Sequence, residues 1–435
     1  MRGKRKTQHA VLASFMTALI FMGSGCQLIQ APGAKTNNLP QITLNYWSVF
    51  NNSAEMATVI DAYTAENPNI TVKYRKLEIT EYESALIDAL ATGQGPDLFS
   101  VHNSWMPKYI DKLEPIPVEQ SPIKEYAPIV KETAVSNANL YGLPYSVDTL
   151  ALYYNPKILS SAGIATPPAT WDEFDTAVKK ISTKDAAGNL TREGAAIGTL
   201  ANVNRGIDPL FLLMLQNATP MTNTTNTEAT FANSQVQQDG QRYSPGLAAF
   251  NKYLGYSRSN STTYTWNKDK PSAFEEFAAG KLGMLFNYQF NQARIAALKP
   301  ELEFRIAPAP QIKGTQNPIS YPSFWLEGVS KKSTQQLEAW KFLVFATGKD
   351  GAKLYTDATK KPAARLDLIE AQKADRMLNP FATQALIAKG WYQKDASAIE
   401  TAFTDTINAI LAGTRSSENA LQQAETQVTN IMKGN

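Results

Sequence analysis

At the start of the expected globular part, segments with the hydrophobic period of a strand alternate with segments that have the period of a helix. Residues 42–46 and 70–74 alternate apolar and polar side chains, a period of two that predicts strands, and residues 98–101 form a short apolar run. Between them, apolar positions over residues 56–63 and 82–89 recur at helical spacing. The order strand, helix, strand, helix, strand predicts an α/β fold with a parallel sheet and right-handed crossovers.

Two loops that follow these strands are candidates for ligand contact. In open α/β sheets, ligands bind beyond the carboxyl ends of the strands, where the loops converge. The loops are residues 47–52, which begin with Trp47, and residues 102–105, which end with Trp105. We expect both at the same edge of the sheet.

The rest of the chain carries further elements of both kinds. Residues 141–155 are dense in aromatic and β-branched side chains, which predicts a strand, and residues 174–181 have helical spacing. Residues 217–240 are rich in Thr, Asn and Gln, which indicates an exposed loop. Two amphipathic helices are expected near the end, over residues 399–410 and 421–431.

The N-terminus places a basic region, an apolar run and small residues in front of the only cysteine, Cys26. This order is typical of a bacterial lipoprotein signal peptide over residues 1–25. The apolar run at residues 11–22 would span roughly 18 Å as a helix, short of the ~30 Å hydrocarbon core of a bilayer. We therefore expect cleavage before Cys26, its lipidation, and a flexible tether over residues 26–40; a free thiol with cleavage nearby is the alternative.

Composition narrows the chemistry. The 435 residues carry a formal net charge of +3, and loss of the four basic residues of the signal leaves −1, so the charge indicates no nucleic-acid partner. Beyond the signal, His102 is the only histidine, and there is no second cysteine. This argues against a disulfide, a Cys/His metal site or a histidine-based triad, and we expect no metal and no cofactor. The length exceeds what one hydrophobic core supports and predicts two lobes.

Several sequence segments follow one another in a characteristic order. They are A-T-G-Q-G-P-D-L-F at 91–99, Y-G-L-P-Y-S-V-D at 141–148, P-P-A-T-W-D-E-F at 167–174, A-F-E-E-F-A-A-G-K-L-G-M-L-F-N at 273–287, and a weaker series from A-P-A-P at 307–310 to K-K-P-A-A-R at 360–365. Each is unspecific alone. In this order and spacing they resemble the family 1 extracellular solute-binding proteins of ABC importers, which include carbohydrate-binding members such as the maltose-binding protein.

The resemblance implies a fold of the periplasmic-binding-protein type II class, with two α/β lobes, hinge strands and a central ligand cleft. The chain would cross between lobes near Asp148, again between residues 310 and 322, and a third time just after Thr347-Gly348. Lobe 1 would then comprise residues 41–147 and 312–347, and lobe 2 residues 148–311 and 348–435.

Recognition of a sugar requires flat apolar faces for the C–H sides of the ring and planar polar groups for its hydroxyls. Aromatic residues near the expected strand ends and lobe crossings could supply the faces, and for each the alternative is packing in a core. The aromatic candidates are Trp47, Trp105, Tyr145, Tyr288, Phe290 and Trp325.

The polar candidates come from three segments of the resemblance. Asn103 and Ser104 lie in the loop where relatives hold the sugar with charged groups, and Asp148 matches a ligand-binding carboxylate of the maltose-binding protein. Arg365 ends the K-K-P-A-A-R segment. Asp148 could instead cap backbone amides at the hinge, and Arg365 could form a surface ion pair.

These features predict a monomeric binding protein, not an enzyme, anchored by lipid on the extracytoplasmic side of the cell membrane. It would capture a carbohydrate between its lobes and deliver it to an ABC transporter permease. The alternative is the same fold binding a peptide, a polyamine or another small polar molecule. A secreted carbohydrate-active enzyme is less favoured, because Asp148 has no obvious second acid at a neighbouring strand end.

Overall fold

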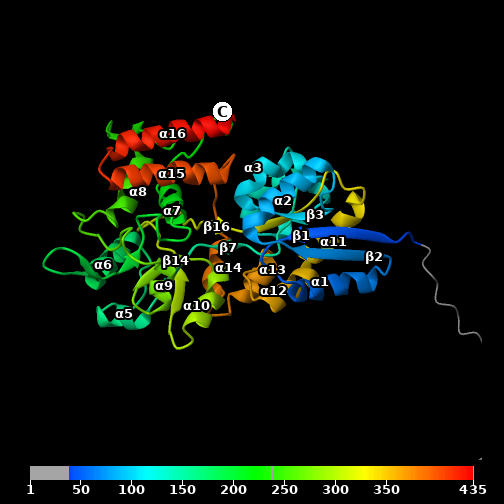
Figure 1. The fold of residues 1–435 in the computed structure, drawn as a ribbon, viewed down its shortest axis with the longest axis horizontal. Coiled ribbons are helices and arrows are strands. Elements are labelled where there is room, and N and C mark those ends of the chain that lie inside the picture. The colour runs from blue at the N-terminus through cyan, green and yellow to red at the C-terminus, as the bar shows by residue number, and fades with distance from the viewer. Residues whose placement is uncertain (1–38, 237–238, 435) are drawn as a thin grey trace, which may run out of the picture. The chain divides into compact units, whose positions relative to one another are not determined.

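The computed structural model describes residues 39–236 and 239–434 (Figure 1). All described helices and strands belong to the unit Gln41–Asn435, which is the second of the two units into which the chain divides. The expected signal peptide, Cys26 and nearly all of the expected tether lie outside the described residues. Within the described part of the chain, no helix combines the length and apolarity needed to cross a bilayer.

The first sheet has the strand order β17-β3-β1-β2. β1 (Ile42–Ser48) pairs in parallel with both β2 (Ile70–Lys76) and β3 (Leu98–His102), which confirms the predicted parallel arrangement. β17 (Trp325–Val329) returns from far along the chain and pairs antiparallel with β3. The ends of β1 and β3 and the start of β17 therefore meet at one edge of this sheet.

Helices α1 and α2 connect these strands. α1 (Ser53–Glu66) begins with a capping box, in which Asn52 Oδ1 accepts the N–H of Glu55 at 2.9 Å and the Glu55 carboxylate accepts the N–H of Asn52 at 2.8 Å. α2 (Ile79–Thr92) ends at Gly93, whose φ of +74° suits a residue without a side chain. The other elements around this sheet are α3 (Met106–Tyr109), β4 (Ile116–Pro117), α4 (Pro128–Ala134), β5 (Val135–Ser136), β6 (Asn139–Leu140), α11 (Gln336–Thr347), α12 (Lys349–Thr359) and α13 (Leu366–Gln372).

A second four-stranded sheet has the order β11-β14-β8-β15. Its strands are β8 (Ala151–Tyr154), β11 (Ala195–Ala196), β14 (Met284–Asn287) and β15 (Arg305–Pro308). The helices around it are α5 (Pro156–Ser161), α6 (Trp171–Ile181), α7 (Asp208–Gln216), α8 (Pro245–Gly255), α9 (Ala273–Ala278), α10 (Gln292–Leu298), α15 (Ala396–Leu411) and α16 (Ser417–Lys433). Two small hairpins, β9 (Thr183–Lys184) with β10 (Leu190–Arg192) and β12 (Gln235–Val236) with β13 (Arg242–Tyr243), complete this part.

Each sheet has its own hydrophobic core, so the second unit consists of two lobes (Figure 1). The core of lobe 1 runs from Leu44 to Val147 and resumes at Phe324, while the cores of lobe 2 begin with Leu150 and Ala151. This confirms the expected two-lobe α/β fold.

The lobe boundaries differ in part from those expected. Residues 312–321 stay with lobe 2, since Tyr321 is buried in its core. Helices α12 and α13, expected in lobe 2, contribute Tyr355 and Ile369 to the core of lobe 1. The final crossing therefore falls beyond α13 rather than after Thr347-Gly348, because the apolar faces of these two helices pack on lobe 1.

The crossing strands are short. β7 (Asp148–Thr149) pairs antiparallel with β16 (Pro322–Ser323), and α14 (Asn379–Ala385) lies against β7. Gln384 of α14, only 1% exposed, donates to Thr149 Oγ1 and to the carbonyl of Leu150 at 3.2 Å each, and accepts the N–H of Ala309 at 2.9 Å. One buried amide thus ties the first crossing to the second sheet.

A buried carboxylate lies within the core of lobe 1. Glu327 of β17 is 3% exposed, and its Oε2 lies 2.6 Å from Ser100 Oγ, which is 2.7 Å from Ser48 Oγ. Burial raises the pKa of Glu327 to about 7, although the hydrogen bond from Ser100 and the charge of Lys361 oppose this. The folded protein therefore retains a proton on this carboxyl at pH values where an exposed glutamate has lost it.

Replacing Glu327 by Gln should reduce the pH dependence of stability. Between about pH 4.5 and 7 the unfolded chain releases this proton while the folded protein keeps it, so the free energy of unfolding of the wild type should fall as the pH rises through that window. Urea denaturation at pH 5 and pH 8 should show a difference smaller by roughly 1–3 kcal/mol in Glu327→Gln. The exposed Glu119→Gln variant serves as the control and should keep the wild-type difference; an equal difference in all three proteins would contradict the prediction.

Candidate functional site

An aromatic cluster lies at the sheet edge of lobe 1. Trp325, the first residue of β17, has ring centroids around it at 5.7 Å (Phe50), 6.1 Å (Tyr82), 5.2 Å (His102) and 5.2 Å (Trp105). Phe50 follows β1, and Trp105 follows β3 in the short helix η1 (Asn103–Trp105). The expected convergence of the two loops is therefore what brings these rings together.

Phe50, rather than the predicted Trp47, is the ring of residues 47–52 that joins the aromatic cluster. Trp47 lies inside β1 and is partly buried against the core of lobe 1, with the guanidinium carbon of Arg75 at 4.9 Å from its ring centroid. Phe50 is 54% exposed and contacts Trp325. Its φ of +66° is unusual for a residue with a side chain and turns the chain sharply after the strand. The loop was predicted as a site segment, but nothing in the sequence singled out Phe50.

Polar side chains of residues 102–104 form hydrogen bonds with one another and with residues 323–324. His102 has Nδ1 at 2.8 Å from Ser104 Oγ and Nε2 at 3.2 Å from Ser323 Oγ. Burial, with a smaller contribution from the positive charge of Arg205, lowers the pKa of His102 to about 3, so its ring is neutral at physiological pH. Asn103 accepts the N–H of Phe324 through Oδ1 at 3.0 Å.

Lobe 2 carries an aromatic pair of its own. The rings of Tyr288 and Phe290 stack with centroids 5.7 Å apart and an interplanar angle of 8°. Tyr288 is fully buried and donates through its hydroxyl to Asp208 Oδ2 at 2.7 Å, whereas Phe290, in the short helix η5 (Gln289–Asn291), is 51% exposed. The exposed ring is thus held on a rigid buried one.

Asp148 is bound to backbone amides. Its carboxylate accepts the N–H groups of Thr149 at 2.8 Å, Gln289 at 3.1 Å and Phe290 at 3.3 Å. Burial raises the pKa of Asp148 to about 7, although these hydrogen bonds oppose the rise. The geometry is that of the amide cap weighed in the sequence, and it fixes the loop that presents Phe290.

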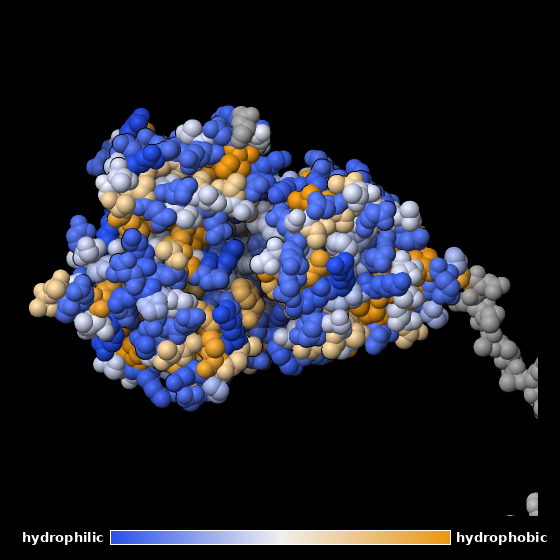
Figure 2. Space-filling view, viewed as in Figure 1, coloured by the Kyte–Doolittle hydropathy of each residue, from blue (hydrophilic) through white to orange (hydrophobic). Residues whose placement is uncertain are grey.

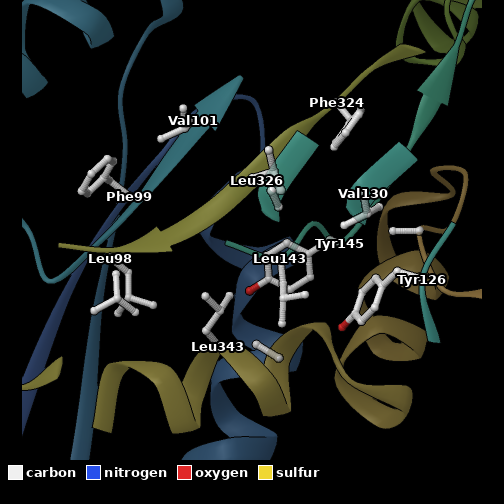
Figure 3. Close-up of a cluster of buried hydrophobic side chains, with 14 of the residues drawn as sticks. Leu98, Phe99, Val101, Tyr126, Val130, Leu143, Tyr145, Phe324, Leu326 and Leu343 are labelled. Carbon is white, nitrogen blue, oxygen red and sulfur yellow. The ribbon is translucent and has the colours of Figure 1, made fainter. Parts of the chain in front are cut away.

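Two other candidates, Tyr145 and Arg365, are buried in lobe 1, the first among apolar side chains and the second in ion pairs. Tyr145 is 3% exposed among Leu143 and Leu343 (Figure 3) and stacks on Tyr355 with centroids 4.5 Å apart. Arg365, whose side chain is 7% exposed, forms ion pairs with Glu125 and Asp367. We therefore place neither of the two in the proposed binding site.

A small cavity of about 30 Å³ lies between the lobes. Its lining from lobe 1 includes His102, Asn103 and Ser104, and its lining from lobe 2 includes Arg205, Asp208 and Glu400. Figure 2 shows the surface hollowed where the two lobes meet. Arg205, Asp208 and Glu400 carried no sequence signal, because they become neighbours of the His102 loop only when the lobes are apposed.

A larger hollow lies elsewhere. It has a volume of about 340 Å³ and is bordered by residues 163–170, α6 and Lys313 on lobe 2. None of the aromatic candidates borders it. None of them borders the small cavity either, whose aromatic lining consists of Phe211 and Tyr321.

The lobes also touch outside the cavity. Lys108 of α3 pairs with Glu83 of its own lobe at 3.0 Å and with Asp395, the N-cap of α15 on lobe 2, at 3.5 Å. Gln289 of lobe 2 donates through Nε2 to the carbonyl of Lys360 in lobe 1 at 2.9 Å. The described arrangement is therefore one in which the lobes contact each other.

Two lobes with separate cores, short crossing strands and a cavity between them are the architecture of the two-lobe solute-binding proteins. The family model of the bacterial extracellular solute-binding proteins matches residues 50–353, and the chain belongs to this family. Membership implies a location outside the cytoplasm.

Comparisons with individual proteins agree with this assignment. The maltotriose-binding protein of Pyrococcus abyssi is 31% identical over 127 residues, which cover 28% of this chain and 26% of that protein. The cyclic α-maltosyl-1,6-maltose binding protein of Arthrobacter globiformis has a similar structure, with a TM-score of 0.75, 19% identity, and coverage of 91% of this chain and 100% of that one. The sugar-binding protein MalE of Xanthomonas citri gives a TM-score of 0.74 at 20% identity, covering 90% and 98%.

Removing the carboxylate of Asp148 should weaken the hinge. Asp148→Ala leaves three buried or half-buried N–H groups without their acceptor, so the free energy of unfolding should fall by about 1–3 kcal/mol in urea denaturation. Asp185→Ala is the matched control, because Asp185 accepts the N–H groups of Ala187 and Asn189 in an exposed turn. This substitution should lower the free energy of unfolding by less than Asp148→Ala does. Equal losses in the two variants would contradict the role assigned to Asp148.

Proposed function

We propose that this protein binds a carbohydrate between its lobes and delivers it to an ABC transporter permease. The observation that carries the proposal is a pair of half-exposed aromatic rings, one on each lobe, each backed by a second ring. Phe50 lies against Trp325 on lobe 1, and Phe290 lies on Tyr288 on lobe 2. A ring packed against a second ring is held in a fixed orientation and presents a flat apolar face.

The chemistry of the surroundings supports a sugar as that partner. Ring faces stack on the C–H sides of a pyranose. The cavity of about 30 Å³ has room for little more than water, so a sugar would reach the polar side chains of Asn103, Ser104 and Arg205 only with the lobes further apart. A micromolar dissociation constant corresponds to about −8 kcal/mol. Stacked rings together with several hydrogen bonds of roughly 0.5–1.5 kcal/mol each reach this value after ordering costs.

The similar proteins point in the same direction, since their names mention maltotriose, a cyclic maltosyl-maltose and sugar. A ligand that contacts both lobes favours the closed form by its differential affinity for the two forms. Closure would then be the state that the permease recognises.

The proposal predicts ligand-dependent stability and fluorescence. A saccharide at 100 times its dissociation constant should add about 2.7 kcal/mol to the stability of the purified protein, seen as a thermal shift in a screen of mono- and oligosaccharides. Because Trp325 lies next to Phe50, the same ligand should change the tryptophan fluorescence, and Trp325→Phe should remove most of that change.

Trp340→Phe is the matched control, because Trp340 is 5% exposed and donates to the carbonyl of Glu114 inside lobe 1. It should keep the response. Phe50→Ala and Phe290→Ala should each weaken binding, since each removes one exposed ring. If a peptide or polyamine gave a thermal shift and no saccharide did, the proposal of a carbohydrate ligand would be wrong, and the peptide or polyamine would take its place.

We also propose that Cys26 carries a lipid that holds the protein on the outer side of the membrane. The support is the basic, apolar and small-residue order in front of the only cysteine. A lipid chain adds about 0.8 kcal/mol of membrane affinity per buried methylene, so its loss should release the protein. In fractionated bacterial cells, Cys26→Ser should move the protein from the membrane to the soluble fraction; an unchanged distribution would exclude the anchor.

A further inference from the structure

Lobe 2 contributes one arginine to the cleft, and its loop is tightly held. Arg205 has a φ of +57°, in the left-handed region that is costly for a residue with a side chain. At the next residue, Gly206, a Cβ would lie 2.9 Å from the carbonyl oxygens of Thr199 and Val203. The hydroxyl of Tyr253 donates to the carbonyl of Gly206 at 2.6 Å. Packing around the loop therefore maintains a backbone conformation that its sequence alone would not favour.

The guanidinium of Arg205 is fixed by a buried carboxylate. Its Nε and Nη2 donate to Asp208 Oδ2 at 2.8 Å and Oδ1 at 3.0 Å, and the side chain of Asp208 is fully buried. Tyr288 donates to the same carboxylate at 2.7 Å. A two-pronged pair of this kind sets the plane of the guanidinium as well as its position. The side chain is thus held in place before any ligand arrives.

One edge of this guanidinium remains open to the cavity. Nη1 donates to no residue that the structure describes, and 34% of the Arg205 side chain is exposed. Two other polar atoms at the border of the cavity also have no hydrogen-bond partner among the described residues. Asn103 Nδ2 donates to none of them, and Oε1 of the buried Gln393 accepts from none of them. The cavity therefore presents both free donors and a free acceptor.

The charges around the cavity are balanced or slightly negative. Asp208 neutralises Arg205, Glu400 adds a further carboxylate at the border, and the neutral ring of His102 adds no charge. An anionic ligand would find no uncompensated cation and would face the carboxylate of Glu400. A hydroxyl both donates and accepts, so it can use every free group.

We propose that Arg205 is the specificity-determining residue of lobe 2 and that it selects neutral saccharides over uronic acids. Nη1 donates to ring hydroxyls, and Gln393 accepts from them. This inference rests on the proposed function and adds the chemical class of the sugar to it.

Isothermal titration calorimetry can test the inference with two related probes: the neutral saccharide that gives the largest thermal shift and its uronic acid counterpart. The wild type should bind the neutral sugar at least about 10-fold more tightly than the uronic acid, since a hydrogen bond to a charged group contributes about 10- to 100-fold. The double variant Arg205→Gln with Asp208→Asn should weaken neutral binding by a similar factor and reduce the discrimination. It removes both charges together, so no unpaired carboxylate is left buried.

Two further variants make the outcome decisive. Arg205→Lys keeps the charge but lacks the planar fork, and it should also lose affinity for the neutral sugar. Arg294→Gln is the control, because this guanidinium lies over the ring of Phe274 at 4.3 Å in the same lobe and should leave binding unchanged.

Contradicting results are distinct from one another. Tighter binding of the uronic acid by the wild type would overturn the inference and leave sugar binding intact. The inference would also be overturned if the double variant folded natively and kept the wild-type affinities. If the double variant does not fold, wild-type affinities in Arg205→Lys would overturn it instead. If the wild type binds no saccharide, the proposed function and the inference both fail.

Discussion

The arrangement of the lobes depends on satisfying backbone hydrogen bonds where the chain crosses between them. β7 and β16 are each only two residues long, so their pairing leaves neighbouring amides and carbonyls in need of partners. Two buried side chains supply partners there: Asp148 accepts three N–H groups, and Gln384 donates to Thr149 Oγ1 and to the carbonyl of Leu150 and accepts the N–H of Ala309. Because Asp148 holds the amide of Phe290, the same contacts that fix the crossing also fix the ring proposed to bind ligand.

Much of the fold could be predicted because its signals are local. The alternation over residues 42–46 and 70–74 and the pairing of Asn52 with Glu55 each need only a few residues, and the structure has the predicted strands and cap. The boundary between the lobes was harder to predict from the sequence. Helical spacing shows that α12 and α13 have a buried face, but it does not reveal which of two cores receives that face, and the structure packs both on lobe 1.

The site was predictable at the level of loops and less so at the level of side chains. The rule that ligands lie at the carboxyl ends of strands selected the segments that carry Trp105 and Phe50, and both rings contact Trp325. Which ring of residues 47–52 is exposed depends on a turn at Phe50 that has no sequence signature. Arg205 was not identifiable either, because its importance comes from Asp208, from a buried tyrosine and from an opposing lobe remote in sequence.

The contact between Lys108 and Asp395 has a consequence for how such a receptor responds to its surroundings. The two side chains are about one third exposed and belong to different lobes, so the contact exists only while the lobes are apposed. Dissolved ions screen such a pair, with a Debye length of about 8 Å at physiological ionic strength. Raising the salt concentration removes part of the intrinsic bias toward apposition, and apparent affinity scales with the fraction of molecules that are competent to bind. Capture of a completely uncharged molecule would then vary with the salinity of the medium outside the cell.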